Sequence, residues 1–289
     1  MKLKSIFRWV AIAGVGALTA TTLVVAPAAA EPRSLVRIAE GNLRTSLNAD
    51  HRNHNLVENG TVEYLTGDGF WYYNDKSQVV LKPGFGKQEL ISSDPLTVRT
   101  TINPGIVWSD GTPIDAVDML LPWVTGSGLF DDTASGTNWD AVGKKTGLEK
   151  ITKFPKISAD GKSITWTFSQ FDSAWAFFFG IGKPVHALTQ LAYPRDSNSA
   201  AKARFLKAVK AKDFKTLKLI ADQWNTAYNF IDTQAINSRT NPKLLVSAGA
   251  YMVKSSEVGK SMTLVENPRY TSGPKPKIKT IQLVTIPDP

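Results

Sequence analysis

Hydrophobic and polar residues alternate in several short segments of the chain, which is the pattern of β-strands that bury one face. Residues 88–91 and 96–102 flank the turn Ser92-Ser93-Asp94-Pro95, and residues 156–157 and 163–168 flank Ser158-Ala159-Asp160-Gly161. An Asp-initiated turn between two such segments predicts a β-hairpin in each case. Further strands are predicted at residues 35–39, 251–253, 262–265 and 281–286.

Helical spacing of apolar residues occurs in two other regions. Thr112 is a candidate N-cap, Pro113 suits a first helical turn, and Asp115 places a carboxylate near the positive end of the helix. The second region, residues 199–224, has apolar side chains at helical spacing with lysines between them, which predicts a solvated face over a buried stripe. Aromatic runs at residues 70–73 and 175–179 are expected in buried positions. Strands and helices are mixed, so we predict an α/β (mixed α+β) architecture.

The first thirty residues have the three-part order of a secretory signal. Basic residues at the start precede an apolar stretch and then Ala28-Ala29-Ala30, which predicts cleavage before Glu31 rather than an uncleaved anchor. The chain carries 34 basic and 25 acidic residues, and removal of residues 1–30 lowers the formal charge from +9 to +6. An exported protein of modest charge rarely meets nucleic acid, so we expect no nucleic-acid partner. The expected location is extracytoplasmic, in the periplasm or at the cell surface.

Composition narrows the possible chemistry. The 289 residues contain no cysteine and three histidines. This excludes disulfides, zinc fingers, thiol catalysis and attachment of a lipid to a lipobox cysteine. His51 and His54 could share a metal on a helix, but the surrounding Asn and Asp residues favour a loop, and we expect no metal site. No Gly-x-Ser-x-Gly elbow and no phosphate-binding loop occurs, so we expect neither a catalytic residue nor a cofactor.

Three segments resemble one known family. Trp108-Ser109-Asp110-Gly111-Thr112-Pro113, within residues 103–118, is similar to a signature of the extracytoplasmic solute-binding proteins of ABC importers, in the oligopeptide/dipeptide-binding family (family 5 type). Gly249-Ala250-Tyr251 and Asn267-Pro268-Arg269-Tyr270 resemble a later strand and turn of that family. Residues 37–48 resemble its opening strand and loop, although Asn48-Ala49 stands where the family has Asp-Pro. Capping and turn chemistry explain the acidic residues of the first segment, so we assign them a structural role.

The resemblance implies a periplasmic-binding-protein-like fold of type II. It further implies a first solute-binding lobe of residues 31–65 and 187–289, with an inserted, β-hairpin-rich subdomain at residues 66–186. In the family, the segment that resembles residues 280–289 leads into a second lobe that closes over the ligand. We therefore expect this chain to correspond to the N-terminal portion only, with the second lobe absent and with weak binding of peptide as a consequence.

The resemblance also implies a function and a set of site residues. The expected function is binding of a peptide, or another small solute, for delivery to an ABC permease by a monomeric, non-enzymatic protein. Candidate ligand contacts are, in the loop after the first strand, Asn53, His54 and Asn55, and elsewhere Phe130, Trp139 and Tyr251. Dipeptides, oligopeptides, nickel complexes and sugars all remain open as ligands. A secreted hydrolase of peptide or cell-wall material, or a peptide-sensing receptor of the same fold, is the alternative.

Overall fold

The computed structural model describes residues 34–230 and 235–286. The predicted signal segment lies outside the described residues. Within the described ranges, no helix combines the length and the hydrophobicity needed to cross a bilayer.

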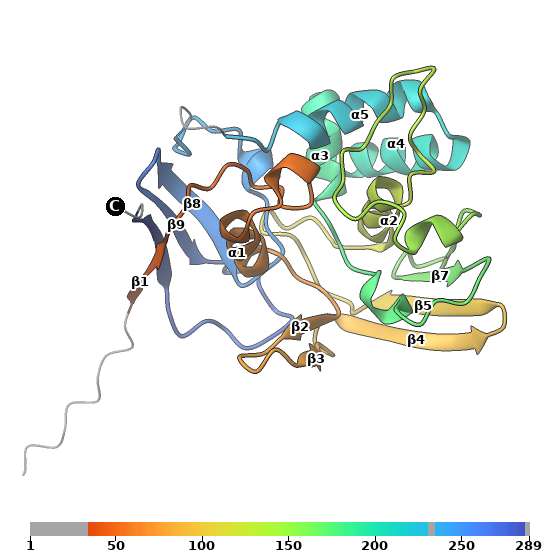
Figure 1. The fold of residues 1–289 in the computed structure, drawn as a ribbon, viewed down its shortest axis with the longest axis horizontal. Coiled ribbons are helices and arrows are strands. Elements are labelled where there is room, and N and C mark those ends of the chain that lie inside the picture. The colour runs from red at the N-terminus through yellow and green to blue at the C-terminus, as the bar shows by residue number, and fades with distance from the viewer. Residues whose placement is uncertain (1–33, 231–234, 287–289) are drawn as a thin grey trace, which may run out of the picture. The chain divides into compact units, whose positions relative to one another are not determined.

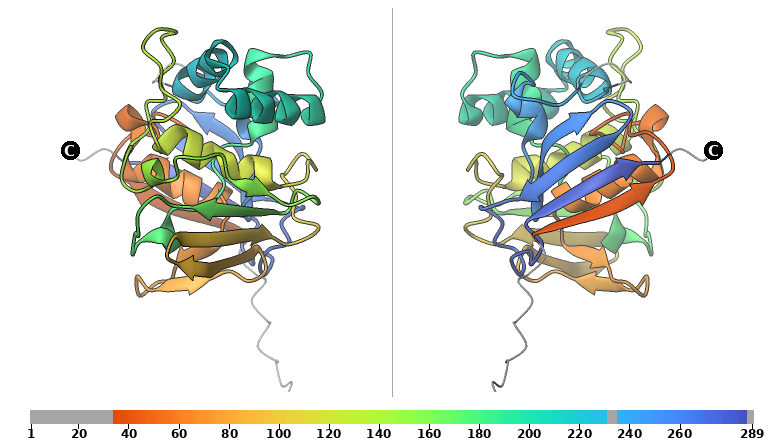
Figure 2. Two further views of the ribbon diagram at one scale, coloured as in Figure 1. Left: turned by 90° about the vertical axis from the view of Figure 1, so that its right-hand side faces the viewer. Right: turned by 90° about the vertical axis from the view of Figure 1, so that its left-hand side faces the viewer.

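One four-stranded sheet joins the two ends of the described chain. Its order is β1 (Leu35–Glu40), β10 (Thr280–Thr285), β9 (Ser261–Glu266) and β8 (Tyr251–Glu257), with β1 parallel to β10 and the other pairs antiparallel (Figure 2, right). Helix α1 (Val57–Thr66) adds Val62 to the apolar residues of this sheet, so that a small hydrophobic core forms between them. Because β1 and β10 are about 240 residues apart in sequence, this pairing is a product of tertiary folding.

A second four-stranded sheet is antiparallel throughout. Its order is β4 (Gly86–Ser93), β5 (Leu96–Ile102), β7 (Ser163–Thr167) and β6 (Lys156–Ile157) (Figure 1). The β4–β5 and β6–β7 turns occupy the predicted positions, so both predicted hairpins are confirmed. A separate hairpin, β2 (Trp71–Tyr73) with β3 (Val79–Leu81), lies beside this sheet.

Four further helices complete the larger core. They are α2 (Ala116–Gly126), α3 (Val185–Ala192), α4 (Asn198–Ala211) and α5 (Phe214–Thr226). Of these, α2 packs on the second sheet. Helix α2 lies between β7 and the α3–α4 pair, so its apolar residues contact both. Short 3-10 helices occupy Arg52–His54, Leu148–Lys150, Trp175–Phe177 and Pro242–Leu245. The mixed α/β class predicted from the sequence is confirmed. The predicted boundaries at 65/66 and 186/187 stay a prediction.

The predicted start of α2 was wrong by one turn. The N-cap is Asp115, whose Oδ1 accepts a hydrogen bond from the Val117 amide at 2.9 Å, while Asp118 Oδ2 accepts from the Asp115 amide at 3.1 Å. Thr112 instead belongs to a turn, since its carbonyl accepts from the Trp108 amide at 2.8 Å. The reciprocal Asp115–Asp118 bonds satisfy two amides that a Thr112 cap would leave unpaired.

The region 199–224 is two helices rather than one. Lys212 adopts a left-handed conformation with φ of 50°, which ends α4, and Asp213 caps α5 through the Thr216 amide. The predicted solvated lysine face is also wrong at Lys202, which is 7% exposed. In the aromatic run at residues 175–179, Phe179 is buried as predicted, whereas Phe177 is half exposed.

Candidate functional site

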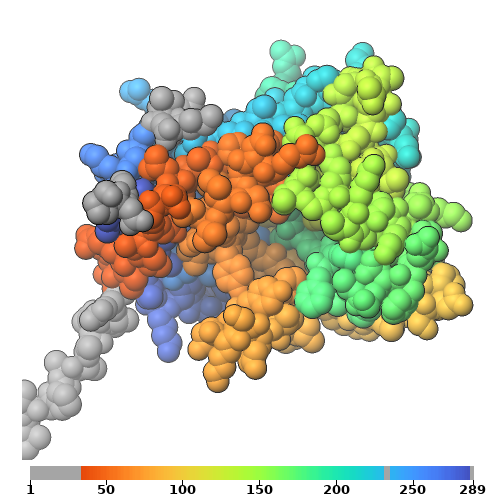
Figure 3. Space-filling view, viewed as in Figure 1, coloured from red at the N-terminus to blue at the C-terminus, as the bar shows by residue number. Residues whose placement is uncertain are grey.

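A groove of about 900 Å³ lies on the described part of the molecule. It is open to solvent between α1 and the β2–β3 hairpin (Figure 3). Its walls combine apolar and aromatic side chains with a few charged groups, the composition expected of a small-molecule site. The lining comes from the loop after β1 (Ala49, Asp50, Asn55), from residues 63–69, 71–72, 81–84, 181–184 and 272–274, and from Gly60, Trp108, Val246, Ala248, Ala250, Tyr251 and Tyr270.

An ion pair between Lys183 and Glu63 joins three segments of this wall. Lys183 Nζ lies 2.6 Å from Glu63 Oε1 and also donates to the Leu47 carbonyl. The other Glu63 oxygen accepts from the Ala49 amide at 2.9 Å. The Lys183 ammonium is 5.7 Å from the ring centroid of Tyr228, and burial raises the pKa of that phenol. Helix α1, the opening loop and the segment before α3 are therefore held in one arrangement.

A second ion pair fixes the opposite part of the groove. Lys82 pairs with Asp68, and the Ser272 hydroxyl donates to the same carboxylate. The Lys82 ammonium lies 4.9 Å from the Tyr270 ring centroid. Gly84 makes this closeness possible, because a Cβ there would be 2.2 Å from the Ser272 carbonyl oxygen. The β2–β3 hairpin is thus bound to the loop at residues 270–274.

Asp50 differs from the other charged residues of the groove. Its side chain has no hydrogen bond or ion pair with any described residue, and it is exposed to the groove. The nearby Glu63 carboxylate and the surrounding protein raise the pKa of Asp50 to about 7, against the attraction of Lys183. Both effects disfavour the ionised form, so near neutral pH this carboxyl is divided between its two protonation states.

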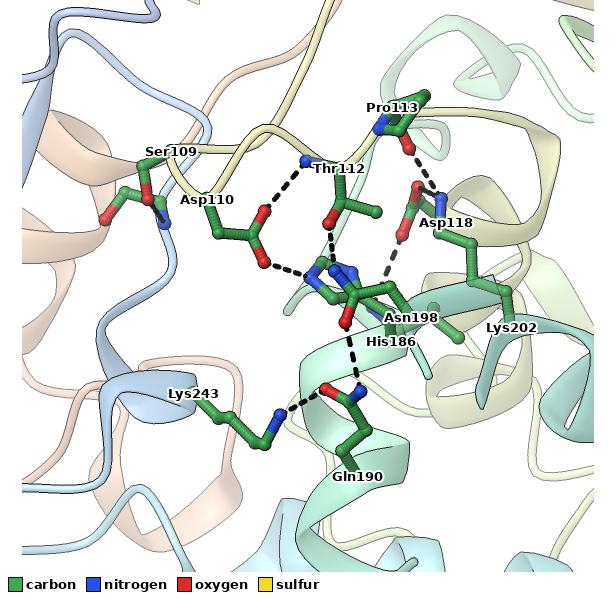
Figure 4. A network of polar contacts seen from close by, with 12 residues as sticks. Ser109, Asp110, Thr112, Pro113, Asp118, His186, Gln190, Asn198, Lys202 and Lys243 are labelled. Atoms are coloured by element: carbon green, nitrogen blue, oxygen red, sulfur yellow. Dashed lines mark hydrogen bonds and ion pairs between the residues drawn. The ribbon is translucent and has the colours of Figure 1, made fainter. Parts of the chain in front are cut away.

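A polar network supports the groove wall at Trp108. Asp110 accepts a hydrogen bond from the Thr112 amide at 2.9 Å, and its other oxygen lies 2.8 Å from His186 Nε2 (Figure 4). Although burial disfavours the Asp110 carboxylate, bonds from His186 and Thr112 lower its pKa to about 2. His186 is 1% exposed, and its Nδ1 has no hydrogen-bond partner among the described residues. The pair thus fixes the turn beside the groove, and no hydroxyl of the described residues is bonded to the imidazole.

Buried charges behind this turn hold it against α4. Lys202 Nζ lies 2.6 Å from Asp118 Oδ2 and 3.0 Å from Asp115 Oδ2, and it donates to the Pro113 carbonyl at 2.7 Å. Asp118 is fully buried and also accepts from the Val185 amide at 3.3 Å. Burial disfavours the Lys202 ammonium, but the two carboxylates outweigh it and raise the pKa of Lys202. The acidic residues assigned a structural role from the sequence have that role here.

Two of the predicted ligand contacts line the groove. Asn55 donates through Nδ2 to the Ala49 carbonyl at 2.9 Å, and the Tyr251 hydroxyl donates to the Ile278 carbonyl at 2.9 Å. In each residue, one donor therefore makes a hydrogen bond within the protein, while part of the side chain borders the groove.

The other four predicted contacts are placed elsewhere. Asn53 and His54 lie on the 3-10 turn after Asp50 and are not among the groove-lining residues. His54 Nδ1 lies 3.0 Å from the Thr45 hydroxyl. Phe130 and Trp139 are 1% and 0% exposed and belong to the larger core. A ligand role for these four residues stays a prediction, and none of them lines this groove.

Sequence reasoning missed the charged residues of the groove. Glu63 lies on α1 and Lys183 is 120 residues further along the chain, so no local spacing connects them. Asp50 lies in the loop after the first strand, close in sequence to the candidate contacts Asn53 and Asn55, and that was the available signal. The rings of His51 and His54 are 5.1 Å apart, and the described residues contain no group of three or more His, Cys, Asp or Glu placed to hold a metal.

Comparison with known proteins identifies one family whose model matches this chain. The model of the bacterial extracellular solute-binding proteins, family 5 Middle, matches residues 80–289. An uncharacterized lipoprotein of Mycobacterium leprae is 23% identical over 272 residues, which is 92% of this chain and 44% of that protein. The relative is named a lipoprotein, whereas the sequence here contains no cysteine.

Solved structures give the same fold. A periplasmic EDTA-binding protein superposes with a TM-score of 0.65 at 22% identity, over 89% of this chain and 40% of that one. The oligopeptide-binding protein of Bacillus subtilis, solved with a nonapeptide, superposes with a TM-score of 0.56 at 14% identity, over 89% and 41%. The chain thus spans about two fifths of the length of these proteins. The predicted solute-binding-protein fold is confirmed, with a match to a single lobe.

Proposed function

The chain belongs to the bacterial extracellular solute-binding proteins of family 5, and from this premise we propose that its groove binds a small solute, with peptides as the first class to test. The observation that carries the proposal is the groove itself. Its volume of about 900 Å³ is within the range of ligand pockets, ~300–1,000 Å³, and two ion pairs hold its walls in place. A prearranged wall loses little conformational entropy when a ligand binds.

The choice of peptide is supported by the mixed character of the walls. Trp71, Tyr72 and Leu81 offer apolar surface, while Asn55 offers a polar side chain to amides. Among the superposed proteins, one binds EDTA and another a nonapeptide, so the fold alone selects no ligand. We propose Asn55 and Tyr251 as ligand contacts, an ABC permease as the membrane partner, and no catalytic step.

Equilibrium ultrafiltration of the chain with a mixture of peptides, sugars and metal chelates, followed by mass spectrometry of the retained molecules, tests this function. The equilibrium format suits the weak binding expected of a single lobe. We expect peptides to be enriched with the protein. Enrichment of sugars or metal chelates alone would contradict the peptide assignment.

Two glycine substitutions locate the bound molecule. A Cβ at Gly60, which lines the groove, and at Gly41, which lies outside it, meets no atom within 4 Å. Gly60→Trp should obstruct part of the groove and reduce the amount of peptide retained, while Gly41→Trp should leave it unchanged. Equal retention by both variants would show that the ligand binds elsewhere.

A further inference from the structure

The positive and negative charges that line the groove are unequal in number. They are three acids and two bases: Asp50, Glu63, Asp68, Lys82 and Lys183. Lys183 pairs with Glu63 and Lys82 pairs with Asp68. One negative charge is left when all five groups are ionised, and it belongs to Asp50.

The two paired carboxylates have their oxygens engaged by the protein. Glu63 accepts from Lys183 and from the Ala49 amide, and Asp68 accepts from Lys82, from Ser272 and from the Gly69 amide at 2.8 Å. Asp50 makes no such contact within the described residues, although its carbonyl accepts from the Val142 amide at 2.8 Å. The following residue, His51, forms a bridge with Ala141. A free carboxyl is therefore carried by a backbone that is fixed in place.

We propose that the solute carries a cationic group, an amine or a guanidinium, that binds the carboxylate of Asp50. This inference rests on the proposed function and adds the charge of the ligand. The cation would restore the charge balance of the groove and offset the repulsion between Asp50 and Glu63. It would also give Asp50 the hydrogen bonds that the protein does not supply.

Binding by this route depends on pH. The Glu63 carboxylate and the protein that surrounds the groove raise the pKa of Asp50 to about 7, and Lys183 opposes the shift. A cation binds the ionised form, so affinity should increase as pH rises through 7. With a guanidinium ligand, which stays charged, the ionised fraction of Asp50 predicts weaker binding at pH 5.5 than at pH 8, by up to about 30-fold when the protonated form does not bind.

Three amidated tripeptides separate the sources of the positive charge. Ala-Ala-Ala presents an α-amine, acetyl-Ala-Arg-Ala presents a guanidinium, and acetyl-Ala-Ala-Ala presents neither. Calorimetric titration of the 289-residue chain at pH 8 should show at least one cationic probe binding about tenfold or more tighter than the neutral one. Asp50→Asn should reduce that ratio to within about twofold and remove the pH dependence. Asp75→Asn, an exposed acid outside the groove, should change neither.

The outcomes distinguish this inference from the function on which it rests. Equal affinity for the three peptides, or a preference that survives Asp50→Asn, would overturn the cationic ligand and leave peptide binding intact. No binding of any probe would overturn both. Because the Asp50 side chain makes no bond to a described residue, Asp50→Asn should fold normally. The pH profile of the unsubstituted chain gives a readout that needs no variant.

Discussion

Substitution of Lys202 by Met should destabilise the protein strongly. Lys202 is 7% exposed, and its ammonium contacts three acceptors: Asp118 Oδ2 at 2.6 Å, the Pro113 carbonyl at 2.7 Å and Asp115 Oδ2 at 3.0 Å. Methionine keeps most of the apolar stem and removes the charge. The fully buried Asp118 carboxylate is then left without its counter-ion.

Removal of one partner from a buried ion pair costs about 3–5 kcal/mol of the free energy of unfolding. With a urea m-value of about 3 kcal/mol/M, the unfolding midpoint should fall by ~1–1.7 M. Urea titration followed by tryptophan fluorescence at pH 7.5 measures this shift. Lys207→Met, on the exposed part of the same helix, is the matched control and should change stability by less than about 0.5 kcal/mol.

Two further measurements test whether the unpaired Asp118 carboxylate causes the loss of stability. The double variant Lys202→Met/Asp118→Asn should be more stable than Lys202→Met alone, because no unpaired charge remains buried. Burial already raises the pKa of Asp118, and loss of the ammonium raises it further. The deficit of Lys202→Met should therefore be smaller at pH 5 than at pH 7.5. A midpoint shift equal to that of Lys207→Met, or a deficit that does not change with pH, would refute the reasoning.

Three other predictions concern the turn, the hairpin and export. The pKa of Asp110 is lowered to about 2, so its contribution to stability, ~1 kcal/mol after allowance for solvent exposure, is present above pH 4 and lost as pH falls through 2. In thermal unfolding, Asp110→Asn should therefore match the unsubstituted chain near pH 2 and be less stable at pH 7. Equal stability of the two proteins at pH 7 would contradict this prediction. Gly84→Ala should lower the free energy of unfolding by more than about 2 kcal/mol, because its Cβ would lie 2.2 Å from the Ser272 carbonyl oxygen. Gly69→Ala is the control and should be tolerated, because a Cβ there meets no atom within 4 Å. Equal melting temperatures of the two variants would contradict the close approach at Gly84. N-terminal sequencing of the exported form should begin at or near Glu31, and recovery of Met1 would indicate an anchor.

The local parts of the fold could be predicted from the sequence because short-range rules determine them. Strand alternation around an Asp turn predicted both hairpins, since period-two burial and turn chemistry act within about ten residues. The Trp108–Asp118 segment identified the family. The same segment misled the prediction of the helix start, because Thr112 and Asp115 are both acceptable caps by residue type. Only the reciprocal bond from Asp118 selects Asp115.

The groove and its charges were decided by tertiary structure. Glu63 pairs with a lysine 120 residues away, and Asp68 receives a hydroxyl from a serine 204 residues away. No periodicity or motif links such positions, because the contacts exist only after the two sheets and their helices have packed. The same packing placed Phe130 and Trp139 in the core and turned Lys202 from an expected surface lysine into a buried counter-ion. Residue type determined which groups could carry charge, and burial and proximity determined which of them remain free for a ligand.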